Sequence, residues 1–328
     1  MKKILITGGA GFVGYHIAVK LAANTENQIT IIDNLSRGKS DDMFNELLEK
    51  DNVDFISGDL TQPGFYDKLD TDFDYIYHLA AVIGVKNVMK NPDKVLYVNA
   101  ISTLNIFEYL RKCTNLKKVL FSSTSEIYAG TLKNFGIDVP TGEEVPLTVE
   151  DITTDRTTYA LSKMYGESIC FVYGRKYNVP FSIVRYHNVY GPRMGFAHVI
   201  PEMFIKITEK EVVEVASPTH TRAFCYIDDA VEMTIRSCEY ESTLNEIVHV
   251  GNSSQEITIM QLAETVRNVL GRSTVLTGTE DTAGSPSRRC PDISKIVRLT
   301  KYEPQTSVEQ GIAKTYEWYK TRLQEVYE

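Results

Sequence analysis

The sequence predicts an α/β protein built on a doubly wound parallel sheet, with a smaller C-terminal lobe. Two observations lead to this class. Short apolar runs alternate with helical patterns through the first 185 residues, which is typical of parallel strands joined by helical crossovers. The first apolar run also passes directly into a glycine-rich turn and then a helix. After about residue 190 the alternation gives way to a different pattern, and we expect the second lobe there.

The N-terminal element is a strand over 3–7 that enters the run Gly8-Gly9-Ala10-Gly11-Phe12-Val13-Gly14. A strand, a glycine turn and a helix start form the dinucleotide-binding (Rossmann) fingerprint. Glycines let a pyrophosphate approach bare backbone, and the helix N-terminus offers unpaired N–H groups. The residues expected to contact a dinucleotide here are Gly8, Gly11, Phe12, Val13 and Gly14.

A second apolar run, 28–33, ends in an acidic residue, Asp33. A carboxylate at this point of the fold accepts hydrogen bonds from the adenosine ribose and repels a 2′-phosphate. The sequence therefore favours NAD over NADP, and the nearby Arg37 weakens this preference without reversing it. The alternative is a structural turn that carries a solvated aspartate.

The other elements follow in order along the chain. Further strands are expected near 53–56, 74–79, 117–122 and 181–186, and helices near 12–23, 40–50, 95–112 and 158–177. In the C-terminal part we expect helices near 199–207, 260–270 and 308–323, and a strand-like stretch over 212–227. These patterns predict a dinucleotide-binding domain over 1–185, onto which a segment near 224–250 packs back, and a mainly substrate-binding lobe over 186–328.

Composition excludes several classes of partner. The net charge is −8 without a basic run, so nucleic acid and anionic membrane surfaces are not expected as partners. No apolar stretch is long enough for a membrane span, and the first strand leaves no room for a signal peptide. The five cysteines are scattered without a C-x-x-C pair, and the six histidines lack metal-ligand spacing. We therefore expect a cytoplasmic protein without a metal.

The helical stretch near 158–177 contains the motif Y-x-x-x-K, formed by Tyr159 and Lys163. Residues four apart share a helix face, so the phenol and the ammonium project together. A nearby ammonium and a positive nicotinamide ring both lower the pKa of a tyrosine, which makes the phenol a candidate general base. The alternative is a surface lysine beside a half-buried tyrosine.

A polar cluster follows the apolar run that ends near residue 122, where a parallel sheet binds its ligands. Thr124 is expected to hydrogen-bond the substrate hydroxyl that Tyr159 deprotonates. Glu126 is a candidate second acid or base, and its alternative role is an ion pair on a loop. The predicted catalytic residues are Thr124, Ser125, Glu126, Tyr159 and Lys163.

Taken together, these motifs resemble the extended short-chain dehydrogenases/reductases that act on nucleotide sugars as epimerases, dehydratases or decarboxylases. The resemblance spans nearly the whole chain. It rests on TGGAGFVG at 7–14, DNLS at 33–36, GDL at 58–60, HLAA at 78–81, VN at 98–99, SSTSEIY at 122–128, YALSK at 159–163, RYHNVYGPR at 185–193, RAF at 222–224 and RCPD at 289–292.

The resemblance implies NAD as cofactor, a nucleotide-diphosphosugar as substrate, and a homodimer formed by the helices near 95–112 and 158–177. Further cofactor contacts are implied at Asn34, Ser36, Arg37, Asp59, Leu60, Leu79, Ala80, Ala81, Asn99, Ser122 and Tyr186. Substrate contacts are implied at Asn188, Arg193, Arg222 and Arg289. Arginines suit a diphosphate in a net-acidic protein, although surface ion pairs would use the same residues.

The reaction implied by the resemblance begins with oxidation of the sugar at C4′ to a 4-ketone. Loss of CO2, loss of water or return of hydride to the other face then gives a decarboxylase, a dehydratase or a 4-epimerase. Ser125 stands where deoxyhexose 4,6-dehydratases carry an aspartate, and Thr-Ser-Glu resembles decarboxylases and some amino-sugar dehydratases. We therefore rank decarboxylation or dehydration ahead of epimerisation. A one-way 4-keto-sugar reductase and a non-catalytic NAD sensor remain as alternatives.

Overall fold

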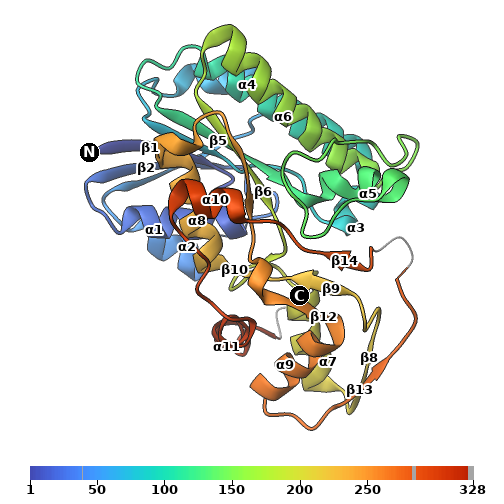
Figure 1. The fold of residues 1–328 in the computed structure, drawn as a ribbon. Coiled ribbons are helices and arrows are strands. Elements are labelled where there is room, and N and C mark those ends of the chain that lie inside the picture. The colour runs from blue at the N-terminus through green and yellow to red at the C-terminus, as the bar shows by residue number, and fades with distance from the viewer. Residues whose placement is uncertain (39, 283–285, 324–328) are drawn as a thin grey trace.

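The computed structural model describes residues 1–38, 40–282 and 286–323. Its centre is a seven-stranded parallel sheet in the order β11-β6-β5-β4-β1-β2-β3 (Figure 1). The strands are β1 (Lys2–Thr7), β2 (Asn27–Asp33), β3 (Val53–Ser57), β4 (Tyr75–His78), β5 (Lys118–Thr124), β6 (Phe181–Tyr186) and β11 (Ile247–Val250). The predicted fold class is confirmed.

Helices cover both faces of this sheet because alternate strand residues point to opposite sides. Leu5 of β1 packs with the helices α4 (Pro92–Leu110) and α6 (Thr157–Tyr177). Its neighbours Ile4 and Ile6 face the other side, which is covered by α1 (Phe12–Ala22) and α8 (Ile227–Glu239). Figure 1 shows α4 and α6 side by side on one face, and α1 and α8 on the other. The glycine turn and α1 connect β1 to β2, and α2 (Asp42–Leu48) connects β2 to β3.

The strand β11 completes the sheet from the C-terminal half of the chain. It pairs in parallel with β6, and Ile247 lies opposite Ile183. This strand falls within the segment near 224–250 that we expected to pack back on the sheet. The pairing matters for the site because it brings a residue of the C-terminal half, His249, beside Arg185.

The C-terminal lobe combines helices with short strands (Figure 1). Its elements are β7 (Val189–Tyr190), α7 (Val199–Glu209), β8 (Val212–Val215), β9 (Thr221–Ala223), β10 (Cys225–Tyr226), β12 (Glu256–Thr258), α9 (Ile259–Val269), β13 (Val275–Gly278), β14 (Arg288–Arg289) and α11 (Val308–Tyr319). Helix α10 (Ser294–Thr300) returns to the central sheet and packs on α8 and β11 (Figure 1). The strand-like stretch over 212–227 is thus three short strands separated by turns. Helix α11 begins with a capping box from Ser307 and Gln310 and ends at Tyr319, four residues before the predicted end.

Several short elements were missed because they are too short for a helical period to show. They are η1 (Pro63–Lys68), α3 (Val85–Lys90), η2 (Ser125–Tyr128), α5 (Ala129–Phe135), η3 (Glu241–Thr243) and η4 (Ser253–Gln255). The helix α8 was missed as well, because its apolar face directly follows strand-like sequence. Within the described parts of the chain, no helix combines the length and apolar character that a bilayer crossing requires.

Candidate active site

The glycine turn between β1 and α1 is shaped for a pyrophosphate. Gly8 has a φ of 75°, and a Cβ there would lie 2.7 Å from the backbone N of Ala80. A Cβ at Gly14 would lie 2.3 Å from the Gly8 carbonyl oxygen. The N-cap residue Gly11 offers no side chain to the first turn of α1, so its N–H groups are left for a ligand. The turn therefore fits the phosphates of a dinucleotide.

A cavity of about 560 Å³ runs from this turn across the carboxyl ends of the central strands. Its volume and donor groups fit NAD. The predicted cofactor residues that line it are Gly8, Gly11, Phe12, Val13, Gly14, Asp33, Asn34, Ser36, Arg37, Asp59, Leu60, Leu79, Ala80, Ala81, Ser122, Tyr159, Lys163 and Tyr186. The structure thus brings these distant motifs to one groove.

Asn99, the remaining residue of the predicted cofactor set, has its side chain behind the residues that line the cavity. Its amide accepts a hydrogen bond from the Val82 N–H at 2.7 Å and donates to the Val82 carbonyl at 3.1 Å. It also donates to the Ser162 hydroxyl at 3.1 Å. Asn99 therefore holds the backbone of Val82, which does line the cavity, in place.

Asp33 joins the end of β2 to the glycine turn. Its carboxylate accepts hydrogen bonds from the Ala10 N–H at 3.1 Å and from the Leu35 N–H at 2.8 Å. Partial burial raises the pKa of this carboxyl group, and the backbone donors oppose that shift. The remaining acceptor capacity of the carboxylate suits ribose hydroxyls.

Arg37 lies further into the cavity than the sequence suggested. Its guanidinium reaches toward Gly84, where an added Cβ would lie 3.8 Å from Nη2. Its positive charge also lowers the pKa of Tyr159. Arg37 follows β2 in the sequence, but its charge acts on the phenol of Tyr159 at the other end of the cavity.

Tyr159 and Lys163 share one face of α6, as their spacing predicts. The Lys163 ammonium lies 6.0 Å from the centre of the Tyr159 ring and donates to the Ser122 carbonyl at 2.7 Å. Burial lowers the pKa of Lys163 to about 8. The ammonium is thus anchored to the end of β5, and the phenol beside it faces the cavity.

Burial is the largest influence on the Tyr159 phenol in the protein without cofactor. Burial raises the pKa of Tyr159 to about 12, and the charge of Glu126 adds to the rise. The Thr124 hydroxyl and the charge of Arg37 act in the opposite direction. The protein alone therefore keeps the phenol protonated at neutral pH. The positive nicotinamide ring of NAD would supply the further charge that favours the phenolate.

Glu126 meets Arg289 at the sugar end of the site. Ser125 and Glu126 open η2, where the Thr124 hydroxyl accepts a hydrogen bond from the Glu126 N–H. An ion pair joins the Glu126 carboxylate to the Arg289 guanidinium. Burial favours a raised pKa for Glu126, but the charges of Arg289, Arg156 and Arg222 outweigh it and lower the pKa. Glu126 is therefore ionised at neutral pH.

Arg156 is a site residue that the sequence analysis missed. It lines a small cavity of about 40 Å³ together with Glu126 and Tyr159. It lies one helical turn before Tyr159, so the i, i+3 spacing could have placed it on the catalytic face. The charges of Arg156, Arg222 and Arg289 all act on the Glu126 carboxylate, and Arg289 is the arginine that contacts it.

The four residues assigned to the substrate do not all lie together. Arg222 and Arg289 are paired residues of the neighbouring strands β9 and β14. Asn188 has a φ of 40° and donates to the Ala223 carbonyl at 3.2 Å, beside Arg222.

Arg193 lies apart from the other three, in the wall of the cofactor cavity. Its guanidinium forms an ion pair with Asp41 at 2.8 Å and stacks on the ring of Tyr15 at 4.0 Å. These partners hold it in the wall of the cofactor cavity, near α1 and α2.

A dinucleotide groove with a Tyr–Lys pair on the adjoining helix defines a site of the short-chain dehydrogenase/reductase class. The sequence model of the NAD dependent epimerase/dehydratase family matches residues 4–251, and the chain belongs to this family. It is an NAD-dependent enzyme of the nucleotide-sugar type, as the resemblance implied.

Two curated relatives cover nearly the whole chain. UDP-glucuronic acid decarboxylase 6 from Arabidopsis thaliana is 32% identical over 324 residues, which are 98% of this chain and 90% of the relative. UDP-N-acetyl-alpha-D-glucosaminuronate decarboxylase from Bacillus cytotoxicus is 32% identical over 335 residues, covering 97% of this chain and 98% of the relative.

Solved structures of similar shape include two epimerases. UDP-glucose 4-epimerase from Thermotoga maritima, with UDP-glucose, has a TM-score of 0.83 at 28% identity and covers 98% of this chain and 99% of its own. UDP-glucuronic acid 4-epimerase from Bacillus cereus, in complex with UDP-glucuronic acid and NAD, has a TM-score of 0.83 at 25% identity. That match covers 99% of this chain and all of the other.

Proposed function

We propose that this enzyme decarboxylates a nucleotide-linked uronic acid, with UDP-glucuronic acid as the first candidate. The observation that carries the proposal is the neighbouring pair Arg222 and Arg289, with Arg289 bound to the Glu126 carboxylate and Arg156 lining the small cavity beside it. Guanidinium groups at this end of the site suit the carboxylate of an anionic sugar and its diphosphate. The names of the two curated relatives support the same reaction.

In this proposal the Tyr159 oxygen takes the proton of the 4′-hydroxyl, and Thr124 orients that hydroxyl. Bound NAD would accept the hydride from C4′ and later return it. The 4-ketone stands β to the C6 carboxylate, so the C5–C6 bond breaks, CO2 leaves and the electron pair becomes an enolate. Protonation at C5 and reduction of the ketone then give a pentose. The arginines hold the departing carboxylate and the diphosphate.

A 4-epimerase is the second candidate. The observation that favours it is the similarity to UDP-glucuronic acid 4-epimerase, whose chain matches this one over its full length. An epimerase would bind the same anionic sugar but retain the C6 carboxylate. The two candidates share Tyr159 and NAD and differ only in the fate of the 4-ketone.

Incubation of the purified protein with UDP-glucuronic acid separates these candidates. We expect CO2 and a UDP-pentose, identified by mass spectrometry and NMR, and we expect Tyr159→Phe to abolish both while NAD still binds. Formation of UDP-galacturonic acid without release of CO2 would show that the enzyme is the 4-epimerase and not the decarboxylase. No product from a panel of UDP-, GDP-, CDP- and dTDP-sugars would contradict both proposals.

We also propose a homodimer formed through the outer faces of α4 and α6. Leu96 and Tyr97 of α4, and Tyr165 and Val172 of α6, expose apolar surface although the two helices pack against each other. Burying this surface against a second copy would remove it from water. Light scattering is expected to give a dimer for the wild type and a smaller species for Tyr97→Glu; a wild-type monomer would overturn the proposal.

The cytoplasm is the compartment we propose, and the support is that all five cysteines are free thiols.

We further propose that residues 1–185 bind NAD and that most of 186–328 binds the nucleotide sugar. The strand β11 lies within the second range but completes the sheet of the first. Binding of NAD alone, measured calorimetrically on the full chain, should survive Arg222→Gln, because this residue lies outside the cofactor cavity.

A further inference from the structure

The two members of the Glu126–Arg289 pair come from segments that are 163 positions apart in the chain. Glu126 lies in η2 at the end of β5, and Arg289 lies in β14 of the C-terminal lobe. Both side chains retain some exposure to solvent, and a partly exposed ion pair contributes little stability by itself. Another contact must therefore hold these two segments in register.

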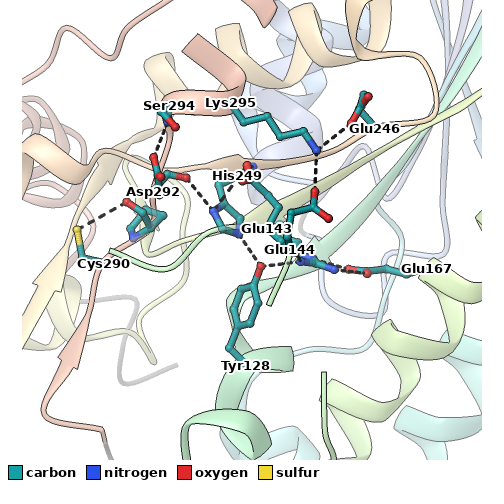
Figure 2. A network of polar contacts seen from close by, with 12 residues as sticks. Tyr128, Glu143, Glu144, Glu167, Glu246, His249, Cys290, Asp292, Ser294 and Lys295 are labelled. Atoms are coloured by element: carbon teal, nitrogen blue, oxygen red, sulfur yellow. Dashed lines mark hydrogen bonds and ion pairs between the residues drawn. The ribbon is translucent and has the colours of Figure 1, made fainter. Parts of the chain in front are cut away.

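A buried histidine links the same two segments. His249 of β11 is fully buried, and its Nε2 lies 2.7 Å from the Tyr128 hydroxyl at the end of η2. Its Nδ1 lies 3.0 Å from the Asp292 carbonyl oxygen, three residues after Arg289. Figure 2 shows the imidazole between the Tyr128 and Asp292 segments. One side chain thus joins the turn of Glu126 to the segment of Arg289.

The chemistry of the partners determines the direction of each bond. A carbonyl oxygen only accepts, so Nδ1 carries the proton and donates to Asp292. In the neutral ring Nε2 is then an acceptor, and the Tyr128 hydroxyl donates to it. Arg185 completes the chain, because its Nη1 donates to the Tyr128 oxygen at 2.6 Å. Burial keeps His249 neutral by lowering its pKa to about 3.

Arg185 connects this chain of bonds to the catalytic helix. Its guanidinium bonds the Glu167 carboxylate of α6 at 2.9 and 2.7 Å. Glu167 also accepts from the Ser123 hydroxyl of β5 at 2.5 Å. The buried network therefore reaches the helix that carries Tyr159 and the strand that ends at Thr124.

The segment before α6 is fastened to the same place. The Thr141 N–H donates to the Cys290 carbonyl at 2.9 Å, and the Thr141 carbonyl accepts from the Asp292 N–H at 2.8 Å. Glu143 accepts from the His249 backbone N–H at 3.0 Å and extends the network (Figure 2). His249 thus lies where the sheet, η2 and the Arg289 segment meet.

We propose that His249 is a positioning residue, whose imidazole holds the Glu126 turn and the Arg289 segment at the spacing that the sugar chemistry requires. This inference rests on the proposed function, because Arg289, which pairs with Glu126, is one of the arginines proposed to hold the departing carboxylate and the diphosphate. His249 touches neither substrate nor cofactor in this proposal. It acts through the bonds that its ring makes with Tyr128 and Asp292.

The test combines His249→Leu with Glu126→Gln and measures turnover of UDP-glucuronic acid at saturating NAD. We expect His249→Leu to lower kcat about tenfold or more, because small displacements of catalytic groups are costly. In the Glu126→Gln background the same change should cost less than about twofold, since residues that act as a unit are non-additive. His249→Asn keeps a donor for Asp292 and should recover part of the rate. If His249→Leu lowers kcat by the same factor with and without Glu126→Gln, the two residues act independently and the proposal is overturned.

Control variants separate positioning from simple loss of stability. Val248→Ala removes a buried side chain from the opposite face of β11, in the main core, and should lower the melting temperature without this loss of kcat. If His249→Leu fails to fold, Tyr128→Phe replaces it, because that variant removes only the hydroxyl that donates to Nε2. A Tyr128→Phe enzyme with wild-type kcat would also overturn the proposal.

A further arm does not depend on the sugar. Long-range 15N NMR of the histidine rings, assigned with the His249→Asn variant, should show His249 protonated at Nδ1 and unprotonated at Nε2. The opposite tautomer would overturn the inference. If the wild type fails to decarboxylate UDP-glucuronic acid, the proposed function fails, whereas the kinetic comparison can be repeated with the sugar that the panel identifies.

Discussion

At the scale of single residues, the reactive phenol depends on charges that come from outside its own helix. Lys163 shares the helix face of Tyr159, yet its ammonium is directed to the Ser122 carbonyl. Arg37, from the loop after β2, contributes a positive charge that lowers the pKa of Tyr159 and so opposes the effect of burial. The spacing of Tyr159 and Lys163 was readable from the sequence, but the contribution of Arg37 required the folded chain.

We expect Arg37→Met to move the pH dependence of turnover to higher pH. A positive charge favours the phenolate, so its removal raises the pKa of Tyr159 and lowers activity at a given pH on the rising limb. The measurement is kcat against pH from 6 to 10 at saturating NAD.

The matched control is Lys176→Met, which removes an exposed cation from the last turn of α6. It should leave the profile unchanged. An Arg37→Met profile that coincides with that of the wild type would contradict the role given to Arg37.

At the scale of elements, α6 can carry the Tyr–Lys pair to the sheet because it packs closely on β5. A Cβ at Gly166 would lie 2.2 Å from the Phe121 ring, which is itself buried. The Lys163 ammonium lies 5.0 Å from the centre of the same ring. Helix α6 was predicted from its period, whereas this close approach depends on which strand lies beneath it.

We therefore expect Gly166→Ala to destabilise the protein by about 1–3 kcal/mol, since overpacking displaces side chains and backbone. Displacement of Phe121 should also move Lys163 and lower kcat. Urea unfolding and steady-state kinetics measure the two effects. Gly64→Ala is the control, because a Cβ there meets no atom within 4 Å. Equal behaviour of the two variants would show that α6 tolerates the added methyl group.

At the scale of the whole molecule, the sheet buries histidines that stay neutral. His78 of β4 and His249 of β11 are both fully buried, and burial lowers the pKa of each to about 3. The ordinary pKa of a histidine, which applies in the unfolded chain, is 6.5. Between these values the unfolded state binds more protons than the folded state, so stability falls as pH falls.

Unfolding free energies at several pH values test this linkage. Each of the two histidines should lower the free energy of unfolding by about 1.4 kcal/mol for every unit that the pH falls, once the pH is well below 6.5. The full contribution is present above 6.5, and the loss continues down to about pH 3. His249→Asn should reduce the dependence of the unfolding free energy on pH by the contribution of one of the two histidines. A stability that does not change between pH 6 and pH 4.5 would contradict the neutral buried state.

The sequence by itself determined the fold class, the type of cofactor and the Tyr159–Lys163 motif. These depend on local signals, namely hydrophobic period, glycine spacing and the residues that end each strand. The tertiary structure decided that Glu126 meets Arg289 and that Arg193 joins the cofactor wall. It also decided that Asn99 lies behind that wall and that Tyr159 needs charge from beyond its helix. Such outcomes depend on contacts between distant segments and on burial, which no local pattern contains.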